Sequence, residues 1–166
     1  MGIVACLASI PSYDLERLKN DTSLIEGYIY PNGGDDEPLN YVDVDKAWHG
    51  IHYVLTGQTD VCDGVLSLAV HGGEEFGPAV TSYGCARFLT AQQVVEVTRA
   101  LSNVSDELLR ERFRPEEMQT KGIYLGEFWT ADPTSTFSYL VNCYERLVRF
   151  YRDASNRGEA AIQWLS

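Results

Sequence analysis

The sequence predicts an α+β domain in which a mixed sheet packs with about five helices. Three observations support this class. A continuous apolar segment lies near the start of the chain, and a long amphipathic helix near its end is followed by a final strand. The expected strands and helices also lack the regular alternation typical of doubly wound folds. With 166 residues, the chain has a common size for one domain, and we expect a single domain over residues 1–166.

The first elements follow from apolar patterning and from breaker residues. Residues 3–10 are apolar or small throughout, which predicts a buried strand. A helix is expected from Pro11 and Ser12 to about Lys19. Residues 31–38 combine two prolines and two glycines with three acidic residues, so we expect an exposed loop there.

The middle of the chain is expected to alternate between helix and strand. Residues 44–56 predict a second helix, which ends at Gly57, and residues 65–70 predict a strand. The glycine-rich residues 71–78 are expected to connect this strand to another one within 79–89.

Capping signals predict the next two helices. Thr90 with Gln93 three residues later is a capping-box pattern for a helix that runs to about Leu101. Ser105 is expected to cap a further helix with acidic residues in its first turn, which Pro115 ends or kinks.

The last helix, over about 135–156, is the clearest element. At 100° per residue, its apolar side chains fall within an arc of about 120°, while three arginines at 146, 149 and 152 lie outside it. Gly158 suits the position after a helix, and residues 159–165 predict a final strand. Those apolar side chains are Phe137, Leu140, Val141, Tyr144, Leu147, Val148 and Tyr151.

Charge and composition exclude several classes of partner. The chain has 24 acidic and 13 basic residues, a formal net charge of −11. Neither nucleic acid nor an anionic membrane is therefore expected as a partner. No apolar run approaches the roughly 20 residues that cross a bilayer. The four cysteines form no C-x-x-C pair, which argues against a zinc knuckle or a thioredoxin-type redox motif. No secretory signal is visible, so we expect reduced thiols and a cytoplasmic location.

Five residues are the candidates for a catalytic or metal site. On the expected helix 44–56, Asp45, His49 and His52 form a polar stripe along one edge. His71 follows the expected strand 65–70, and Glu74 comes three residues later. If these groups converge, they could bind a divalent ion, or a histidine oriented by a carboxylate could act as a general base.

The alternative is that the histidines are structural. The H-x-x-H spacing differs from the H-E-x-x-H of zinc proteases, which weakens the case for metal. On this interpretation His52 is a hydrogen-bonded histidine at the core boundary, and Asp45 or Asp43 caps the helix. No phosphate-binding loop, dinucleotide fingerprint or nucleophile elbow is present, so no cofactor and no resident metal are expected.

The segment Asp43-Val44-Asp45-Lys46-Ala47-Trp48-His49-Gly50-Ile51-His52-Tyr53-Val54-Leu55-Thr56-Gly57 resembles the YfbM-like family of uncharacterised bacterial proteins. The Met1-Gly2 start with its apolar strand, the chain length and the long C-terminal helix also fit. The resemblance implies a cytoplasmic bacterial α+β domain. It implies no activity, and no site residue can be carried over from it.

Two functional hypotheses follow. The first is an interaction domain whose acidic loops, at residues 35–37 and 74–75, bind a basic protein and neutralise it. The second is an enzyme that uses a general base or a metal near His49, His52 and His71. A homo-oligomer with a structural role is a third interpretation.

Overall fold

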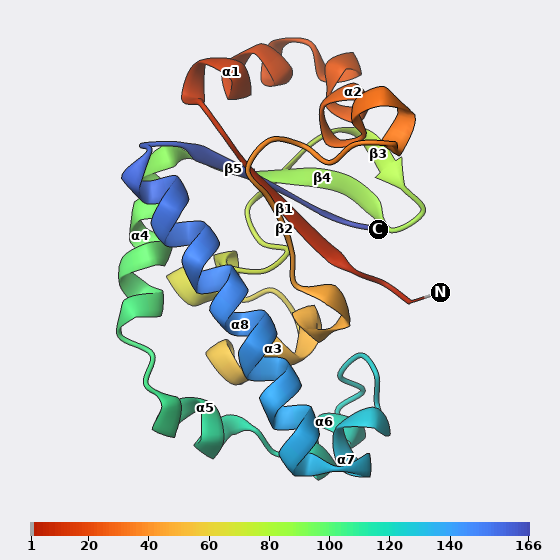
Figure 1. Cartoon of the computed structure of the whole chain (residues 1–166), viewed down its shortest axis with the longest axis vertical. Helices are drawn as coiled ribbons and strands as arrows, with labels where there is room; N and C mark the ends of the chain where they lie inside the picture. Colours follow the sequence, from red (N-terminus) through yellow and green to blue (C-terminus); the bar gives the residue numbers. More distant parts are fainter. Residues whose placement is uncertain (1) are drawn as a thin grey trace.

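A computed structural model describes residues 2–166, which contain one five-stranded sheet in the order β2-β1-β5-β4-β3 (Figure 1). Each of the four strand pairings is antiparallel, so the sheet is antiparallel where a mixed one was expected. The α+β class is confirmed. The strands are β1 (Ala5–Ile10), β2 (Tyr41–Asp43), β3 (Glu74–Thr81), β4 (Gly84–Leu89) and β5 (Ala160–Leu165).

The described residues also contain eight α-helices. They are α1 (Ser12–Asn20), α2 (Ile25–Ile29), α3 (Trp48–Thr56), α4 (Ala91–Ser102), α5 (Asp106–Arg112), α6 (Pro115–Thr120), α7 (Phe128–Ala131) and α8 (Pro133–Asn156). Four short 3₁₀ helices cover Thr22–Leu24, Pro31–Gly34, Asp45–Ala47 and Val65–Leu68. No helix of residues 2–166 combines the length and the apolar character needed to cross a membrane.

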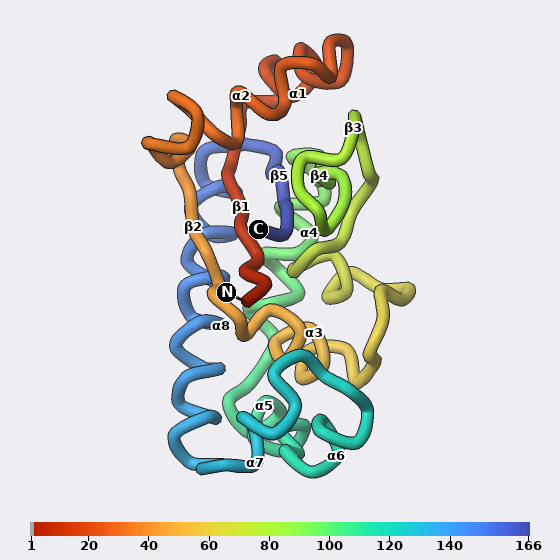
Figure 2. The backbone as a smooth tube through the Cα atoms, turned by 90° about the vertical axis from the view of Figure 1, so that its right-hand side faces the viewer, coloured from red at the N-terminus to blue at the C-terminus, as the bar shows by residue number. Residues whose placement is uncertain are grey.

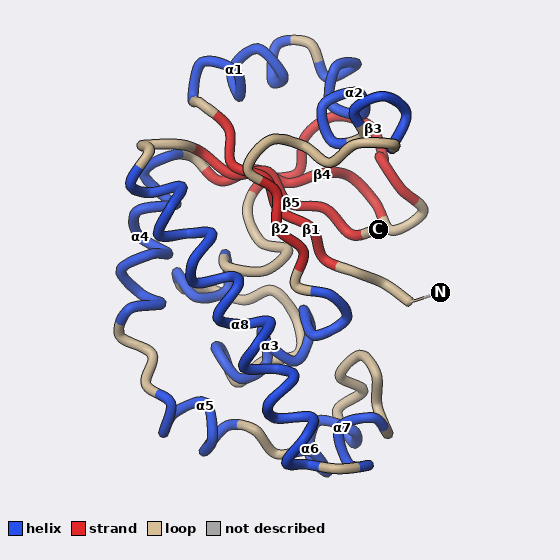
Figure 3. Tube along the Cα trace, in the orientation of Figure 1, coloured by secondary structure: helices blue, strands red, loops and turns tan. Residues whose placement is uncertain are grey.

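The sheet separates two hydrophobic cores of unequal size. Helices α1 and α2 cover one face, and the larger group of helices, including α3, α4 and α8, lies on the other (Figure 3). Successive residues of a strand point to opposite faces, so Leu7 joins the larger core and Cys6 and Ala8 join the smaller one. Because both faces are covered, β1 and β5 are buried throughout, which explains why they are apolar except for Ser9 and Gln163.

The predictions for the second half of the chain are confirmed. Thr90 accepts a hydrogen bond from the backbone N–H of Gln93, and the Gln93 side chain accepts one from the backbone N–H of Thr90, a complete capping box. Ser105 caps α5. Helix α8 spans 24 residues, and Gly158 follows it with φ of 68°, a left-handed conformation that suits glycine.

Two predictions for the middle of the chain are wrong. Residues 65–70 form a 3₁₀ helix at Val65–Leu68 and a turn, because a short apolar run fits a buried helical turn as well as a strand. Residues 74–78, expected in a connection, belong to strand β3. Its Gly77 and Pro78 are tolerated because β3 is an edge strand with two register shifts between Phe76 and Thr81.

Candidate functional site

Two adjoining hollows open on the side of the molecule that carries both ends of the chain, which faces the viewer in Figure 2. They have volumes of about 150 and 540 Å³ and share Cys6, Tyr41 and Ser166. We call them together the acidic cleft. Its remaining walls come from the loop after α2, from strand β2 and from the residues just after β2.

Four carboxylates line the acidic cleft. Asp36 and Glu37 come from the loop that precedes β2, whereas Asp43 ends β2 and Asp45 follows it. Among the residues that line it within 2–166, Lys46 is the one cationic side chain. Four carboxylates against one lysine give this lining a net negative charge, so the cleft attracts positive groups.

These carboxylates are not equally available. Asp43 lies 3.4 Å from Arg146, and the hydroxyl of Tyr139 donates a 3.0 Å hydrogen bond to Asp45. The amide of Asn32 donates to Asp36. Within the described chain, Glu37 has neither a hydrogen bond nor an ion pair and is exposed, so it is the freest of the four.

Aromatic side chains form the floor of the cleft. The rings of Tyr41 and Trp164 lie with their centroids 6.0 Å apart. Trp164 is only 2% exposed, and its indole N–H has no acceptor within residues 2–166. The indoles of Trp48 and Trp129 differ in this respect, since they donate to backbone carbonyls at 3.2 and 2.7 Å. Trp164 therefore carries an unsatisfied donor beside the cleft.

Cys6 also lines the cleft but is not suited to nucleophilic chemistry. Its sulfur lies 3.3 Å from the hydroxyl of Tyr41. Burial raises the pKa of the Cys6 thiol, and the neighbouring carboxylates Asp43 and Glu37 raise this pKa further. The thiol is therefore protonated at neutral pH, and the cleft supplies binding groups rather than an activated nucleophile.

The structure places His49 and His52 where they hold the loop after α3. The Nε2 atom of His49 donates to the carbonyl of Thr59 at 2.8 Å, because its Nδ1 accepts from the backbone N–H of Tyr124 at 2.9 Å. His52 is buried, with its Nε2 2.9 Å from the carbonyl of Asp60. Burial lowers the pKa of His52 and favours its neutral form.

His71 lies in a different environment. Its φ of 54° places it in the left-handed region, and the side chain of Gln163 accepts a 2.7 Å hydrogen bond from its backbone N–H. Burial, and then the charge of Arg87, lower the pKa of His71 to about 4, although Glu75 opposes this. Its buried Nδ1 has no partner within the described residues.

The five candidate residues therefore do not form one site. The ring of Trp48 stacks on His49 with centroids 5.0 Å apart and meets His71 edge-on at 6.3 Å. Asp45 interacts with Tyr139, and Glu74 is exposed at the start of β3. Within residues 2–166, no three histidine, cysteine, aspartate or glutamate side chains are grouped closely enough to hold a metal ion.

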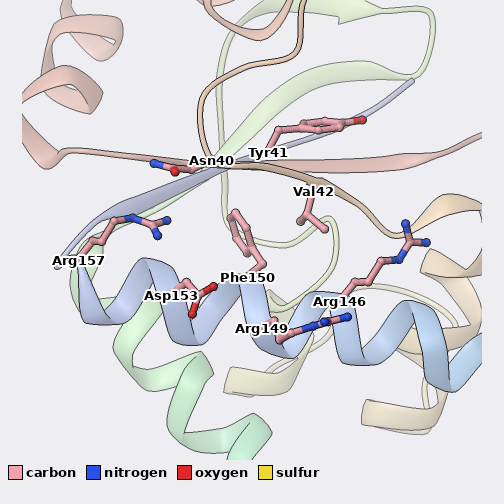
Figure 4. A pocket seen from close by; sticks show the side chains of 8 residues that line it. All are labelled: Asn40, Tyr41, Val42, Arg146, Arg149, Phe150, Asp153 and Arg157. Atoms are coloured by element: carbon pink, nitrogen blue, oxygen red, sulfur yellow. The ribbon is translucent and has the colours of Figure 1, made fainter.

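A second concave region lies between β2 and α8, on the opposite face of the sheet from the Tyr41 ring (Figure 4). We call it the arginine groove. It has a volume of about 280 Å³ and is lined by Asn40, Tyr41, Val42, Arg146, Arg149, Phe150, Asp153 and Arg157. In Figure 4, Val42 points toward α8 and the Tyr41 ring points away from it, as expected for neighbouring residues of a strand.

Sequence reasoning missed the residues on which both regions depend. Trp164 lies in a strand that is apolar except for Gln163, so nothing in the sequence distinguishes it from an ordinary core residue. Arg146 and Arg149 carried a signal, because they lie outside the apolar arc of the last helix at a spacing of three residues. What the sequence could not show is that strand β2, which was not predicted, faces them.

Comparisons with known proteins agree on the fold. A family model described as a domain of unknown function, DUF1877, matches residues 1–164. The crystal structure of YfbM from Escherichia coli, a protein of unknown function, is similar with a TM-score of 0.77 and 21% sequence identity. The similarity covers 98% of this chain and 99% of that chain. At this identity the likeness concerns the fold alone. No curated protein matches the sequence.

Proposed function

Since the chain belongs to the DUF1877 family, whose function is unknown, we propose a function from its geometry: it is an interaction domain that binds a basic protein partner. In this proposal, a lysine or arginine side chain of the partner enters the acidic cleft. The observation that carries the proposal is the net negative lining of the two adjoining hollows, with four carboxylates and one lysine, beside the rings of Tyr41 and Trp164.

The chemistry of the cleft favours a cation attached to a peptide. Carboxylates and aromatic faces both attract guanidinium and ammonium groups. The indole N–H of Trp164 is buried beside the cleft without an acceptor in residues 2–166, and an unpaired buried donor costs about 1–3 kcal/mol. A basic peptide carries such cationic groups.

The net charge of −11 supports the same class of partner. A strongly acidic protein accelerates its encounter with a basic one, and this effect decreases with ionic strength. If the bound cation belongs to the partner's own active site, the contact blocks that site. This is the form of the proposal in which the domain neutralises a basic partner. Catalysis near the histidines is not favoured, because His49 and His52 are engaged in holding a loop.

The proposal is tested with a fluorescein-labelled hexa-arginine peptide as the probe, by fluorescence anisotropy. The wild-type protein is expected to bind the probe, with an affinity that falls as salt is raised. The substitution Glu37→Gln is expected to weaken binding of the probe about fivefold, which corresponds to a loss of about 1 kcal/mol of binding free energy. The matched control is Glu74→Gln, which removes the same charge from another exposed glutamate that does not line the cleft.

The two variants separate a site from a general charge effect. If Glu74→Gln leaves the affinity unchanged while Glu37→Gln weakens it, the cleft is the binding site. Equal losses in both variants, or no binding by the wild type at low salt, would overturn the proposal.

A further inference from the structure

The arginine groove points to a second ligand of opposite charge: we infer that it binds a small, elongated molecule with an anionic group at each end. This inference goes beyond the proposed function, because it concerns another region and does not need the acidic cleft. It starts from an unexpected distribution of charge. A protein with a net charge of −11 places three arginines around one groove.

The three arginines differ in availability. Arg149 is exposed and forms no hydrogen bond or ion pair with any residue of 2–166. Arg146 is paired with Asp43 at 3.4 Å, but both side chains are more than a third exposed, so an incoming anion can compete for it. Arg157 donates to Glu159 at 2.9 Å and to Ser9 at 2.8 Å, which fixes its position.

The spacing of these residues along α8 sets the shape of the ligand. Arg146 and Arg149 are one turn apart, whereas Arg157 lies eleven residues from Arg146, or about 16 Å along the helix axis. Figure 4 shows the first two at one end of the groove and Arg157 at the other. A single small anion such as phosphate cannot contact both ends, so the ligand is elongated.

The residues at the middle of the groove favour a ligand that is uncharged between its two anionic ends. Asp153 lies between the arginines and repels an anionic group placed there. Phe150 is also between them, and Val42 faces it from β2, so the groove offers an apolar surface at its centre. Carboxylate ends with a methylene middle satisfy all of these contacts, which identifies the class as long-chain dicarboxylates or molecules of equivalent shape.

The test is a calorimetric titration with a series of unbranched dicarboxylates from succinate to sebacate, with inorganic phosphate as a single-anion probe. Affinity is expected to rise with chain length to an optimum, and to exceed that for phosphate at least tenfold. Arg149→Gln is expected to weaken binding of the best dicarboxylate about tenfold. The matched control is Arg99→Gln, which removes an exposed arginine from α4, away from the groove.

A second variant distinguishes this site from the acidic cleft. Asp43→Asn removes the partner of Arg146 but keeps the oxygen that accepts from the backbone N–H of Asp45. It is expected to strengthen dicarboxylate binding two- to threefold and to weaken binding of hexa-arginine. No dependence on chain length, or equal effects of Arg149→Gln and Arg99→Gln, would overturn the inference. The dependence on chain length and the comparison of Arg149→Gln with Arg99→Gln are both independent of whether the acidic cleft binds a cation.

Discussion

Gln163 is a buried polar residue whose side chain makes three hydrogen bonds to backbone groups. It points from β5 into the larger core at 1% exposure, and its amide donates to the carbonyl of Leu68 at 2.9 Å and of Gly72 at 3.4 Å. Its oxygen accepts from the backbone N–H of His71. One side chain thus satisfies three backbone groups of the turn that leads into β3.

Replacement of Gln163 by Leu is expected to lower the free energy of unfolding by about 3 kcal/mol. It leaves the backbone N–H of His71 and the carbonyl of Gly72 without partners and removes one of the two donors to the carbonyl of Leu68. The measurement is urea denaturation followed by circular dichroism. Gln92→Leu is the control, since Gln92 is exposed on α4 and its replacement should change stability by less than about 0.5 kcal/mol. A loss at position 163 as small as the control's would contradict this role.

His71 makes stability depend on pH. Its pKa is about 4 in the folded protein and about 6.5 when unfolded, so between these values the unfolded chain binds more protons. Stability contributed by neutral His71 is therefore fully present above pH 6.5 and is lost as the pH falls toward 4. Arg87 and Glu75 are the charged groups beside it, and Arg87 has the larger effect.

The Asn variant isolates this effect. We expect the wild type to lose about 2 kcal/mol more than His71→Asn between pH 7 and pH 4, in parallel urea titrations. Asparagine suits the test because it tolerates the left-handed backbone conformation at this position. Above pH 7 the difference between the two proteins should be constant. Parallel stability curves down to pH 4 would contradict the assignment.

At the scale of elements, Gly50 shows how packing overrides local preference. It lies inside helix α3, where alanine is normally favoured by about 1 kcal/mol. A Cβ at this position, however, would come within 2.8 and 2.9 Å of the Trp129 ring and 3.2 Å of Leu140. Glycine is therefore required where α3 crosses these residues of α7 and α8.

Two glycine substitutions test this explanation. Gly50→Ala is expected to destabilise the protein by about 2 kcal/mol through overpacking. Gly27→Ala, in helix α2, is expected to stabilise it by about 0.5–1 kcal/mol, because a Cβ there meets nothing within 4 Å. Thermal unfolding of both variants gives the comparison. Shifts of the same sign would show that helix propensity, and not contact with Trp129, controls position 50.

The sequence predicts an element well when the residues that determine the element are close together in the chain. Helix α8 follows from the local periodicity of its apolar residues, and the capping box at Thr90 follows from two side chains three residues apart. Both were therefore predicted. Strand β2 has only three residues and is defined by its pairing with β1, from which 30 residues separate it along the chain. The turn at 65–70 likewise depends on Gln163, almost a hundred residues later.

The sequence predicted that the candidate site is acidic, but it did not predict where the site lies in the fold. The acidic loop at 35–37 contributes Asp36 and Glu37 to the cleft, as its exposure suggested. Glu75, expected to serve the same purpose, is paired with Arg87. The sequence placed the histidines together by their spacing. In the structure, His49 and His52 contact loop carbonyls through their Nε2 atoms, whereas the charge of Arg87 acts on His71, and no local pattern predicts these contacts.

At the scale of the whole molecule, strand β2 divides two regions of opposite charge. The acidic cleft lies on one face of the sheet edge and the arginine groove on the other, and Tyr41 belongs to the lining of both. The ion pair between Asp43 and Arg146 connects them. The charges that sum to −11 are therefore unevenly distributed. A ligand meets mainly carboxylates on one side of β2 and mainly arginines on the other.

The cation-binding cleft is the central claim, and nuclear magnetic resonance of the tryptophan side chains tests it most directly. The protein has three tryptophans, and only the indole N–H of Trp164 lacks an acceptor within residues 2–166. In ¹⁵N-labelled protein titrated with hexa-arginine, the indole signal of Trp164 is expected to shift in a saturable manner, whereas those of Trp48 and Trp129 stay in place. Saturable binding of the peptide with an unmoved Trp164 signal would contradict the account.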